Sequence, residues 1–552
     1  MKRNLFMITT SVLSLSLVLG GCTAKNEASP SPSAGASSAP ANSNLNESGL
    51  PIVKDKVTIK AVAQSAELAP AYGEMEIFKR LEQTTNVKVE WSNIPKADYQ
   101  QKKNLLMSTG NLPELFYGAD FTDTDIVNYS KDGTIIPLDD LINKYMPNLK
   151  KLFEKNPALK AFVTSPDGHI YALPSGEELG FGQEGIGSNP DFMFLNKAWL
   201  DKLNMQIPTT IDELHDVLAA FKTKDPNGNG KADEVPMSFM NTFWTGDIGY
   251  LFGAFGVPDK TYQPADNTYA EHLNVKNGKV SFSAVDPKYK EAVAYFHKWV
   301  EEGLIDKESF TYNNNPTPYF AKGKTKDVTL GSYLWWEETE IVGKDRVKDY
   351  VLIPPFKNMV VKYNNGSQWA RASEVITKAA KNPEIIARWL DYQFEPKITA
   401  QMHWGPIGVA FEEKDGKLVQ KELPQGESAG EFRQKVAPNQ SGVVTAEDFK
   451  TIVAPEPRAQ ERMDRIKKFF VPQMEKENYP LIFFTPEELD KIAKIKPDLQ
   501  KFVDQKRTKW LMDGGVEKDW DAYLSTLKKM GLDDLMKIYQ DGLDRYNKAA
   551  KK

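Results

Sequence analysis

Cysteine is almost absent from this sequence, since Cys22 is the only one among 552 residues. An intramolecular disulfide framework is therefore excluded, and the fold must be stabilised by packing, which a chain of this length can provide. Histidine is also scarce, and the five histidines show no H-E-x-x-H or comparable metal-ligand spacing. The G-x-S-x-G pattern of a nucleophile elbow is missing as well. The sequence thus offers no recognisable catalytic set.

The chain lacks a large excess of charge of either sign. Its 70 Lys and Arg and 75 Asp and Glu give a net charge of -5, which does not support a nucleic-acid partner. Hydrophobic content of 41% and charged content of 26% are typical of a soluble globular protein. Gly323-Lys324-Thr325 resembles the end of a P-loop, but Pro318 stands where the earlier glycine is required. Phosphate binding is therefore not expected.

The apolar run at the amino terminus is too short to be an ordinary membrane span. It extends over residues 5–19, whereas a span needs about 20 residues. Lys2 and Arg3 precede it, so the stretch has the charged and apolar parts of an export signal. It ends in Leu19-Gly20-Gly21-Cys22, which resembles the lipobox of bacterial lipoproteins. The resemblance implies cleavage before Cys22 and attachment of a diacylglyceryl group, with palmitate-type acyl chains, to its thiol. An ordinary signal followed by an incidental buried cysteine is the alternative.

The residues that follow Cys22 are expected to form a flexible tether. Residues 23–49 are rich in Ser, Ala, Asn and Pro and have almost no apolar bulk to bury. About 27 residues of coil span roughly 30 Å. We therefore expect a signal peptide over residues 1–21 and a tether over 22–50. The folded part would stand outside the cytoplasm, held at the cell membrane by lipid.

The first part of the folded chain reads as a strand, a helix and a second strand. Apolar residues alternate with polar ones over residues 57–61 and again over 87–91, which is the period of a strand. Between them, residues 74–83 carry apolar side chains at helical spacing. Repeated β-α-β units predict an α/β layer with a largely parallel sheet.

Six short motifs carry a family resemblance over essentially all of the expected mature chain. In this order and spacing they resemble the extracellular solute-binding proteins of carbohydrate ABC importers (family 1 type). The similarity is greatest to the large lipoprotein branch that binds oligosaccharides, including alginate-type and plant-polysaccharide fragments. The motifs are Gly110-Asn111-Leu112-Pro113-Glu114-Leu115, Gly133-Thr134-Ile135-Ile136-Pro137-Leu138-Asp139-Asp140-Leu141, Asp167-Gly168-His169-Ile170-Tyr171-Ala172-Leu173-Pro174, Phe194-Leu195-Asn196-Lys197-Ala198-Trp199-Leu200, Pro208-Thr209-Thr210-Ile211-Asp212-Glu213-Leu214 and Asn382-Pro383-Glu384 with Trp389.

The resemblance implies a type II periplasmic-binding-protein-like fold. Two α/β lobes would enclose an interlobe cleft that closes by hinge motion, and helices would extend the carboxyl terminus. We expect the N-terminal lobe over residues 51–172 plus 326–375 and the C-terminal lobe over 173–325 plus 376–552. The implied partners are an oligosaccharide ligand and the permease subunits of the importer, with the binding protein itself a monomer and no nucleic acid involved.

One loop has the spacing of calcium ligands. Oxygen-bearing side chains stand at its positions 1, 3, 5 and 9, a glycine stands at position 6, and position 7 can offer its backbone carbonyl. Position 12 is Pro236 instead of the bidentate glutamate of an EF-hand, so Glu234 must supply that carboxylate. Members of the resembled branch have such a loop with structural calcium bound; the alternative is a metal-free turn. The implied ligands are Asp225, Asn227, Asn229, Lys231, Asp233 and Glu234.

Sugar recognition uses flat apolar faces together with planar polar groups, so the eleven tryptophans and nearby arginines are the first candidates. Trp199, Trp299, Trp389 and Trp510 fall on apolar helical stripes and are predicted to be core residues. Residues in turns and at strand ends are better ligand candidates. These are Trp244, Trp335, Trp336, Trp369, Arg371 and Trp404, each of which could equally plug a lobe interface.

The sequence therefore favours a lipid-anchored, extracytoplasmic solute-binding protein that captures an oligosaccharide for an ABC importer and is not an enzyme. Two alternatives remain at this stage. One is a secreted carbohydrate-active enzyme, either a glycoside hydrolase or a lyase, because a glycosidase needs only two carboxylates about 5 to 10 Å apart. The other is a lipoprotein adhesin or sensor module. Arg371 gives a slight indication of an acidic ligand.

Overall fold

The computed structural model describes residues 43–180, 182–189, 191–259, 272–312, 315–362, 369–425, 427 and 429–550. The expected signal peptide, Cys22 and most of the expected tether lie outside the described residues. Within these ranges, none of the helices combines the length and the apolar character that crossing a bilayer requires.

A six-stranded sheet organises the first part of the fold, with the strand order β13-β4-β10-β3-β1-β2. β1 is parallel to both β2 and β3, whereas β10 is antiparallel to β3 and β4. The predicted strand, helix and strand over residues 57–91 are confirmed as β1, α1 and β2. The strands are β1 (Val57–Ser65), β2 (Val87–Pro95), β3 (Leu115–Tyr117), β4 (Leu173–Glu177), β10 (Trp369–Ile376) and β13 (Gly442–Val444).

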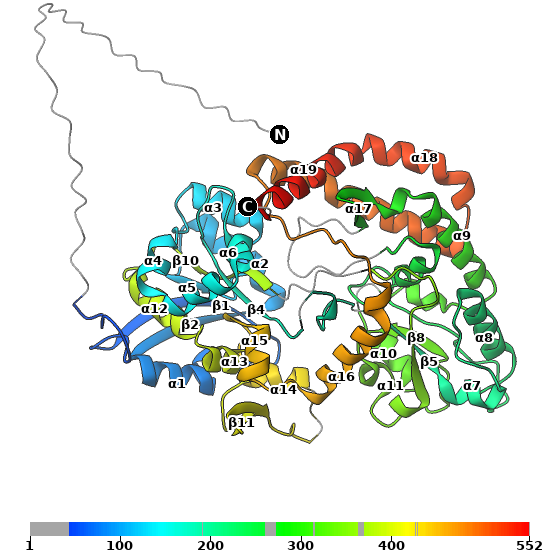
Figure 1. Cartoon of the computed structure of the whole chain (residues 1–552), viewed down its shortest axis with the longest axis horizontal. Helices are drawn as coiled ribbons and strands as arrows, with labels where there is room; N and C mark the ends of the chain where they lie inside the picture. Colours follow the sequence, from blue (N-terminus) through cyan, green and yellow to red (C-terminus); the bar gives the residue numbers. More distant parts are fainter. Residues whose placement is uncertain are drawn as a thin grey trace, which may run out of the picture. The chain divides into compact units, whose positions relative to one another are not determined.

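Helices cover both faces of this sheet. On one face α1 buries Ile77, Phe78 and Leu81, and α12 contacts α4 and α5 (Figure 1). Asp391 of α12 accepts a hydrogen bond of 3.0 Å from the backbone N–H of Leu149, which satisfies a donor in the first turn of α5. The helices are α1 (Glu76–Thr85), α2 (Lys96–Thr109), α3 (Asp123–Lys131), α4 (Asp139–Tyr145), α5 (Pro147–Lys155), α6 (Pro157–Val163), α12 (Pro383–Tyr392) and α13 (Pro396–Trp404).

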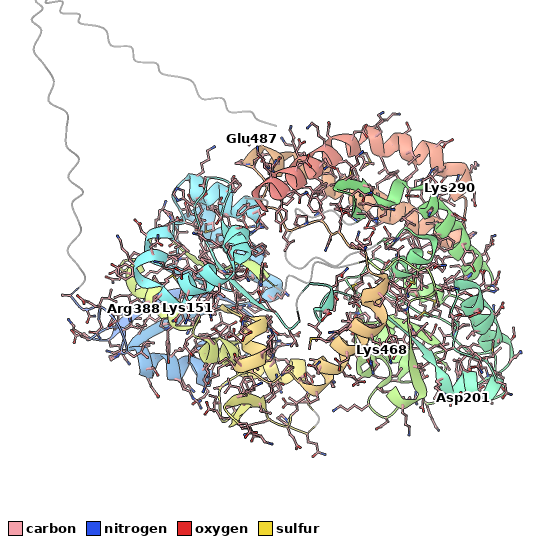
Figure 2. All side chains as sticks on the ribbon, viewed as in Figure 1. Lys151, Asp201, Lys290, Arg388, Lys468 and Glu487 are labelled. Atoms are coloured by element: carbon pink, nitrogen blue, oxygen red, sulfur yellow. The ribbon has the colours of Figure 1, made fainter. Side chains whose placement is uncertain are left out.

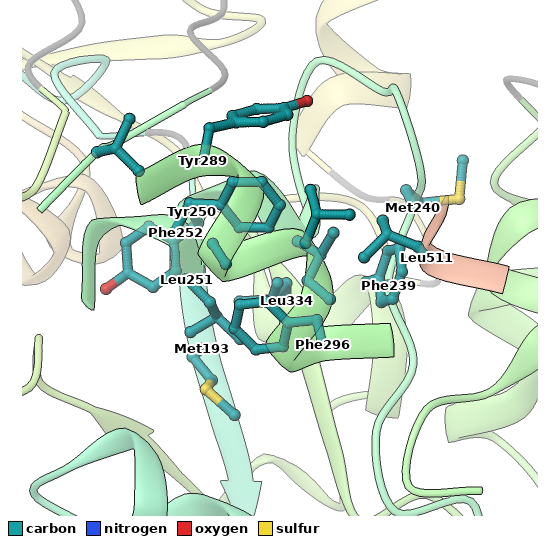
Figure 3. Packing of buried hydrophobic residues seen from close by; sticks show 14 of the residues in the cluster. Met193, Phe239, Met240, Tyr250, Leu251, Phe252, Tyr289, Phe296, Leu334 and Leu511 are labelled. Atoms are coloured by element: carbon teal, nitrogen blue, oxygen red, sulfur yellow. The ribbon is translucent and has the colours of Figure 1, made fainter. Parts of the chain in front are cut away.

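A three-stranded antiparallel sheet, β8-β5-β9, organises the second part. Its core is separate from that of the six-stranded sheet and includes Leu251, Phe252 and Phe296, the two phenylalanine rings being stacked 5.7 Å apart (Figure 3). The elements are β5 (Phe192–Asn196), α7 (Lys197–Leu203), α8 (Ile211–Thr223), β6 (Leu273–Lys276), β7 (Lys279–Phe282), α9 (Pro287–Glu301), α10 (Thr317–Gly323), β8 (Ser332–Trp335), α11 (Glu338–Val342) and β9 (Tyr350–Ile353).

Three long helices end the chain and pack on the second part, α17 on α9 and α19 on β7. They are α17 (Pro486–Asp513), α18 (Val516–Lys529) and α19 (Leu532–Ala550). α17 begins at a capping box, in which Thr485 accepts from the backbone N–H of Glu488 and the Glu488 carboxylate accepts from that of Thr485. The mixed α/β class and the helical carboxyl-terminal region are thus confirmed.

A further segment links β10 to the carboxyl-terminal helices. It contains the hairpin of β11 (Phe411–Lys414) and β12 (Lys417–Gln420), followed by α14 (Ala429–Val436), α15 (Ala446–Thr451) and α16 (Pro457–Arg465). Exposed charged side chains, such as Lys151, Asp201 and Lys468, extend from the ribbon in all these parts (Figure 2).

Sheet membership does not follow the boundaries expected from sequence. β8 and β9 fall within residues 326–375, which were assigned to the first lobe, yet both pair with β5. β4 and β13 were assigned to the second lobe, yet both belong to the six-stranded sheet. All four residues of β8 are buried, so this apolar run would fit either sheet. The strand with which β8 pairs is determined by contacts that are distant in sequence.

Candidate ligand-binding site

A cavity of about 200 Å³ opens at one end of the six-stranded sheet. It is lined by the turn after β3 (Gly118 to Asp123), the first residues of β10 (Trp369 to Ser373) and the segment before β13 (Asn439 and Gln440). β10 runs antiparallel to β3, so its beginning lies beside the end of β3. The cavity therefore lies outside the carboxyl ends of the parallel strands, where α/β sheets generally bind ligands.

The turn after β3 has an unusual backbone. Gly118 has a φ of +59°, and a Cβ at this position would lie 2.2 Å from the carboxamide of Gln440. Asp120 has a φ of +46°, which is uncommon for a residue with a side chain. Its Oδ2 accepts a hydrogen bond of 3.0 Å from Gln100, and its side chain is exposed. This turn brings an exposed carboxylate to the cavity rim.

Arg371 lines the cavity, but its charge is engaged within the protein. Its guanidinium carbon lies 4.6 Å from the ring centre of Phe162 and 4.4 Å from that of Phe483. Its Nε donates to the carbonyl of Phe162 at 2.7 Å, and one terminal nitrogen pairs with the carboxylate of Asp123. The cavity wall therefore contains the planar guanidinium of Arg371, whose charge is compensated by Asp123.

Trp369 forms the apolar part of the same wall. Only 9% of its surface is exposed, and its ring centre lies 5.7 Å from that of Phe162. The indole Nε1 donates to Oε1 of Glu178 at 3.1 Å, which fixes the orientation of the ring. Burial raises the pKa of Glu178, although its hydrogen bonds act in the opposite direction. Of the predicted ligand residues, Trp369 and Arg371 line this cavity.

The segment before β13 supplies two amide side chains. Asn439, Ser441 and Gly442 have φ values of +53°, +68° and +77°, so the backbone is repeatedly left-handed here. Gln440 lies over Gly118, and its amide lies 3.4 Å from the carbonyl of Gln64, which also lines the cavity. The strained segment thus presents polar groups to the cavity.

Trp244, Trp335 and Trp336 form a second aromatic cluster, next to the three-stranded sheet. The ring of Trp244 lies 6.2 Å from each of the other two. Oε2 of Glu340 accepts from both Trp335 and Trp336, at 2.7 and 3.1 Å, and burial raises the pKa of this carboxyl. Trp335 is buried, whereas Trp244 and Trp336 are half-buried. The guanidinium of Arg462 covers Trp336 at 4.4 Å.

Trp404 lies in a third aromatic cluster, with Phe411 and Phe449. Its ring lies 5.7 Å from that of Phe449 and 6.3 Å from that of Phe411, and the guanidinium of Arg433 lies 5.2 Å from it. Trp404 is not among the described residues that line the cavity. The tryptophans predicted to be core residues are buried, as expected: Trp199, Trp299, Trp389 and Trp510.

The calcium-type loop is compact and its acidic groups converge. Oδ1 of Asp225 accepts from the backbone N–H of Gly228 at 2.9 Å, and the amide of Asn227 donates to Asp233 at 3.0 Å. In the parts of the chain that the structure describes, no three His, Cys, Asp or Glu side chains form a metal cluster. However, Oε1 of Glu234 is buried there without a hydrogen-bond partner among these residues, and burial and the nearby Asp225 and Asp233 raise its pKa.

A cation would suit this loop. It would satisfy the buried oxygen of Glu234 and remove the repulsion among the three carboxyl groups. The amides of Asn227 and Asn229 now donate to Asp233. A flip of each amide, which exchanges oxygen for nitrogen, would turn both into oxygen ligands. The residues present therefore fit a hard cation.

Sequence reasoning missed several cavity residues. Gln64, Asp120, Asn439 and Gln440 all line the cavity. Asp120 could have been found, because it directly follows the apolar strand run and Gly118, where parallel strands deliver ligand groups. Gln440 gives no such signal, since its place beside Gly118 depends on a contact across more than 300 residues.

Comparison with known proteins identifies the family. Residues 76–405 match the model of the bacterial extracellular solute-binding protein family. The chain belongs to this family. Its members bind solutes and are not enzymes, so the alternative of a secreted hydrolase or lyase is not supported.

Similar proteins include FusA of Streptococcus pneumoniae, a fructooligosaccharide ABC transporter substrate-binding protein, 38% identical over 99% of both chains. A structure of FusA with kestose has a TM-score of 0.81, and the match covers 90% of this chain and all of the chain in that structure; an EF-hand mutant of FusA with fructo-nystose has a TM-score of 0.80. An HMO-binding solute-binding protein of Bifidobacterium longum infantis is 25% identical, with a TM-score of 0.78, covering 89% of this chain and 99% of that one. Lipoprotein LipO of Bacillus subtilis is 24% identical over 88% of this chain and 93% of LipO.

Proposed function

We propose that this chain captures a neutral oligosaccharide outside the cytoplasm and delivers it to an ABC importer. The observation that carries the proposal is the cavity wall, where Trp369 offers an apolar surface beside the polar side chains of Gln64, Asp120 and Gln440. Apolar faces pack against sugar rings, while amide and carboxylate groups form hydrogen bonds with hydroxyls. This combination suits a saccharide better than an apolar or strongly charged ligand.

The charges of the cavity favour a neutral ligand. Arg371, which hinted at an acidic sugar, is already paired with Asp123 and held between two phenylalanine rings. A uronate would have to compete with Asp123 for this guanidinium and would also meet the carboxylate of Asp120. Lys96 at the rim is the remaining cation of the described lining.

Two of the relatives support a saccharide ligand, and FusA supports a neutral one. FusA is a fructooligosaccharide-binding protein of an ABC transporter, and the Bifidobacterium protein binds HMO. We therefore take short neutral oligosaccharides, with kestose as the first probe, as the expected ligands. An ABC permease would be the partner, and the binding protein would act as a monomer.

We propose that the two sheets mark the two lobes and that the chain crosses between them after β4, after β9 and along α16. This division replaces the boundaries expected from sequence. Trp244 and Trp336 would then form the second wall of the cleft, opposite Trp369. A ligand held by both walls binds the closed form more tightly and shifts the equilibrium towards it, and this form would be what the permease recognises.

The amino terminus is proposed to carry a lipid anchor. Cleavage before Cys22 and lipid attachment to its thiol would anchor the protein to the outer surface of the cell membrane. At least two acyl chains are needed for stable anchoring, which a diacylglyceryl group supplies. The residues that follow would keep the binding domain close to the permease.

Calcium in the Asp225 to Glu234 loop would be structural. The loop is separate from the described lining of the cavity, so the metal would stabilise the fold and leave ligand chemistry to other residues. The converging carboxyl groups support this assignment, as does the existence of an EF-hand in FusA. The protein groups that would hold the ion are Asp225, Asn227, Asn229, Asp233, Glu234 and the backbone carbonyl of Lys231.

Calorimetry against a panel of kestose, milk-type oligosaccharides and trigalacturonate tests the function. We expect binding of a neutral member at micromolar Kd or tighter, recovery of the sugar intact, and no binding of the uronate. Trp369→Ala should weaken binding at least tenfold, because it removes the apolar wall. Trp404→Phe is the matched control, since Trp404 is in a separate cluster, and should bind like the wild type. Cleaved product, or preferred binding of the uronate, would overturn the proposal.

A further inference from the structure

A buried carboxyl group lies directly behind the cavity. Glu374 follows the cavity-lining Ser373 in β10 and has no exposed surface. In the sheet it stands opposite Tyr117 of β3 and Leu173 of β4. Neither of its carboxyl oxygens has a hydrogen-bond partner within the described ranges. An ionised carboxylate is strongly disfavoured in such a place, whereas a protonated one is tolerated.

The described groups around Glu374 include no cation that would compensate an ionised carboxylate. Burial raises its pKa to about 8, and the neighbouring hydroxyls of Ser373 and Ser441 lower it only in part. The phenol of Tyr117 faces it, with that of Tyr72 beyond, and burial keeps the pKa of both phenols above their usual range.

The titratable and charged groups nearest to the 439–442 segment are His403, Glu177 and Arg433, and the guanidinium of Arg433 also donates to the side-chain oxygen of Asn439. His403 of α13 lies 3.1 Å from the carbonyl of Gly442, one residue beyond Ser441. Its other ring nitrogen lies 3.5 Å from Glu177 of β4, which pairs with Arg433 of α14. Among the described residues, none of the three contributes to the pKa of Glu374. At neutral pH Glu374 therefore keeps its proton.

Ser441 connects this acid to the cavity. Its side chain is fully buried, and its hydroxyl lies beside the carboxyl group of Glu374, whose pKa it lowers. It lies in the left-handed segment that presents Asn439 and Gln440 to the cavity, and such a backbone persists only where its surroundings hold it. A protonated carboxyl can both donate to and accept from a hydroxyl, whereas an ionised one can only accept and attracts water. The protonation state of Glu374 thus decides whether the segment of residues 439–442 packs against a neutral acid or against a buried charge.

We propose that Glu374 is a positioning residue that acts as a neutral carboxylic acid and holds Ser441, and through it Asn439 and Gln440, in the ligand-binding position. The proposal rests on the proposed saccharide site. Loss of the proton leaves a buried charge that can be relieved only by water entry or by displacement of the 439–442 segment. Ligand affinity is therefore expected to fall above neutral pH.

The first test is the affinity for kestose between pH 6 and pH 9.5. If only the protonated form binds, the apparent Kd rises as the reciprocal of the protonated fraction, so with a pKa of about 8 for Glu374 binding at pH 9 should be about tenfold weaker than at pH 7. Glu374→Gln keeps the size and the neutral state of the acid, and its affinity should not change over this range. Asp391→Asn is the control, because this buried acid, whose pKa burial raises to about 6, contacts Asn148 and Leu149 and not the cavity. It should retain the wild-type pH profile above pH 7.

A second measurement needs no ligand. Hydrogen exchange of the peptide containing residues 439–444, corrected for the intrinsic effect of pH, should lose protection between pH 7 and pH 9 in the wild type and keep it in Glu374→Gln. An infrared carbonyl band of a protonated acid should be present at pH 7 in the wild type and missing from the variant. Identical exchange in the two proteins, or a flat wild-type affinity profile, would overturn the role of Glu374. Failure to bind any saccharide, with the exchange difference intact, would overturn only the proposed function.

Discussion

At the scale of single residues, the cavity depends on one close approach of the backbone to a side chain. Gly118 lies under the carboxamide of Gln440, at a position where any side chain would occupy the same space. Its positive φ is an independent reason for glycine, because side chains rarely adopt this backbone conformation. The two effects can be separated, since other glycines of the same sheet region share the backbone angle without the contact.

Gly118→Ala is expected to weaken saccharide binding at least tenfold, because the added methyl group displaces Gln440 from the cavity. Gly110→Ala is the matched control, since Gly110 has a φ of +72° and nothing within 4 Å of an added Cβ. Both variants should lose about 1 to 2 kcal/mol of folding stability from the left-handed backbone. Calorimetric titration and chemical denaturation measure the two quantities. Equal ligand affinity of the two variants would contradict the role given to Gly118.

Single residues also show where sequence reasoning ends. The turn-forming residues that precede Trp369 and Arg371 predict both as ligand residues, and both line the cavity. The same reasoning could not find that Arg371 is neutralised by Asp123, because this pair joins residues 248 apart in sequence. Residue type and local position are encoded locally, whereas a partner across the sheet is fixed only by the fold.

At the scale of elements, the loop from Asp225 to Glu234 makes a prediction about metal. Removal of calcium with a chelator should lower the melting temperature of the wild type, because a ligand at 1,000 times its Kd stabilises the folded state by about 4 kcal/mol. Asp225→Ala should melt lower than the wild type and show no further shift with chelator.

Lys231→Ala is the control for this loop, because position 7 contributes only its backbone carbonyl and its side chain is exposed. It should keep the wild-type response to chelator. A wild-type melting curve that chelator does not change would contradict the calcium assignment.

α17 carries a second prediction at this scale. Arg507 is fully buried and binds Asp247 through two hydrogen bonds of 2.9 and 2.7 Å, with Asp259 at 3.4 Å. Arg507→Met leaves two acids buried without this cation and should cost about 3 to 5 kcal/mol in the free energy of unfolding at pH 7. Lys509→Met, which removes an exposed pair with Asp513, should cost less than about 1 kcal/mol.

The cost of Arg507→Met should depend on pH. Burial alone would raise the pKa of Asp259, but His272 and Arg507 lower it to about 2. An acid with a lowered pKa contributes stability above its unfolded value of about 3.9, and this contribution is lost as the pH falls towards 2. The difference between wild type and variant should therefore be greatest above pH 5 and shrink towards pH 3. Urea denaturation at pH 3, 5 and 7 measures it, and a constant difference would contradict the ion pairs.

Elements themselves were largely predictable, whereas their partners were not. The capping pairs at Thr210 and Thr485 and the periodicity of β1, α1 and β2 are local signals, and the structure contains each of these elements. β8 lies within the residues expected in the first lobe but pairs with β5, and its buried run has no alternation to show which strand it joins. Strand pairing depends on contacts distant in sequence, which a single sequence does not display.

At the scale of the whole molecule, the proposed anchor should determine where the protein is found. Wild-type protein should sediment with membranes and dissolve only with detergent, because its acyl chains hold it there. Cys22→Ser has no thiol to modify and should be released in soluble form, with unchanged affinity for the saccharide. Fractionation followed by immunoblotting and calorimetry measures both properties. A wild-type protein that is found entirely in the soluble fraction would contradict the anchor.

The ion pair between Arg507 and Asp247 also has a consequence for the order in which parts of the chain can fold. The two residues are 260 apart in sequence, and until α17 has been synthesised the core around the three-stranded sheet contains an acid without its cation. Residues 1–485, almost nine-tenths of the chain, are therefore expected to leave this core incomplete until the last helices have been made. Such a delay would suit the proposed export, because a polypeptide that crosses a membrane in an extended form is blocked by premature folding.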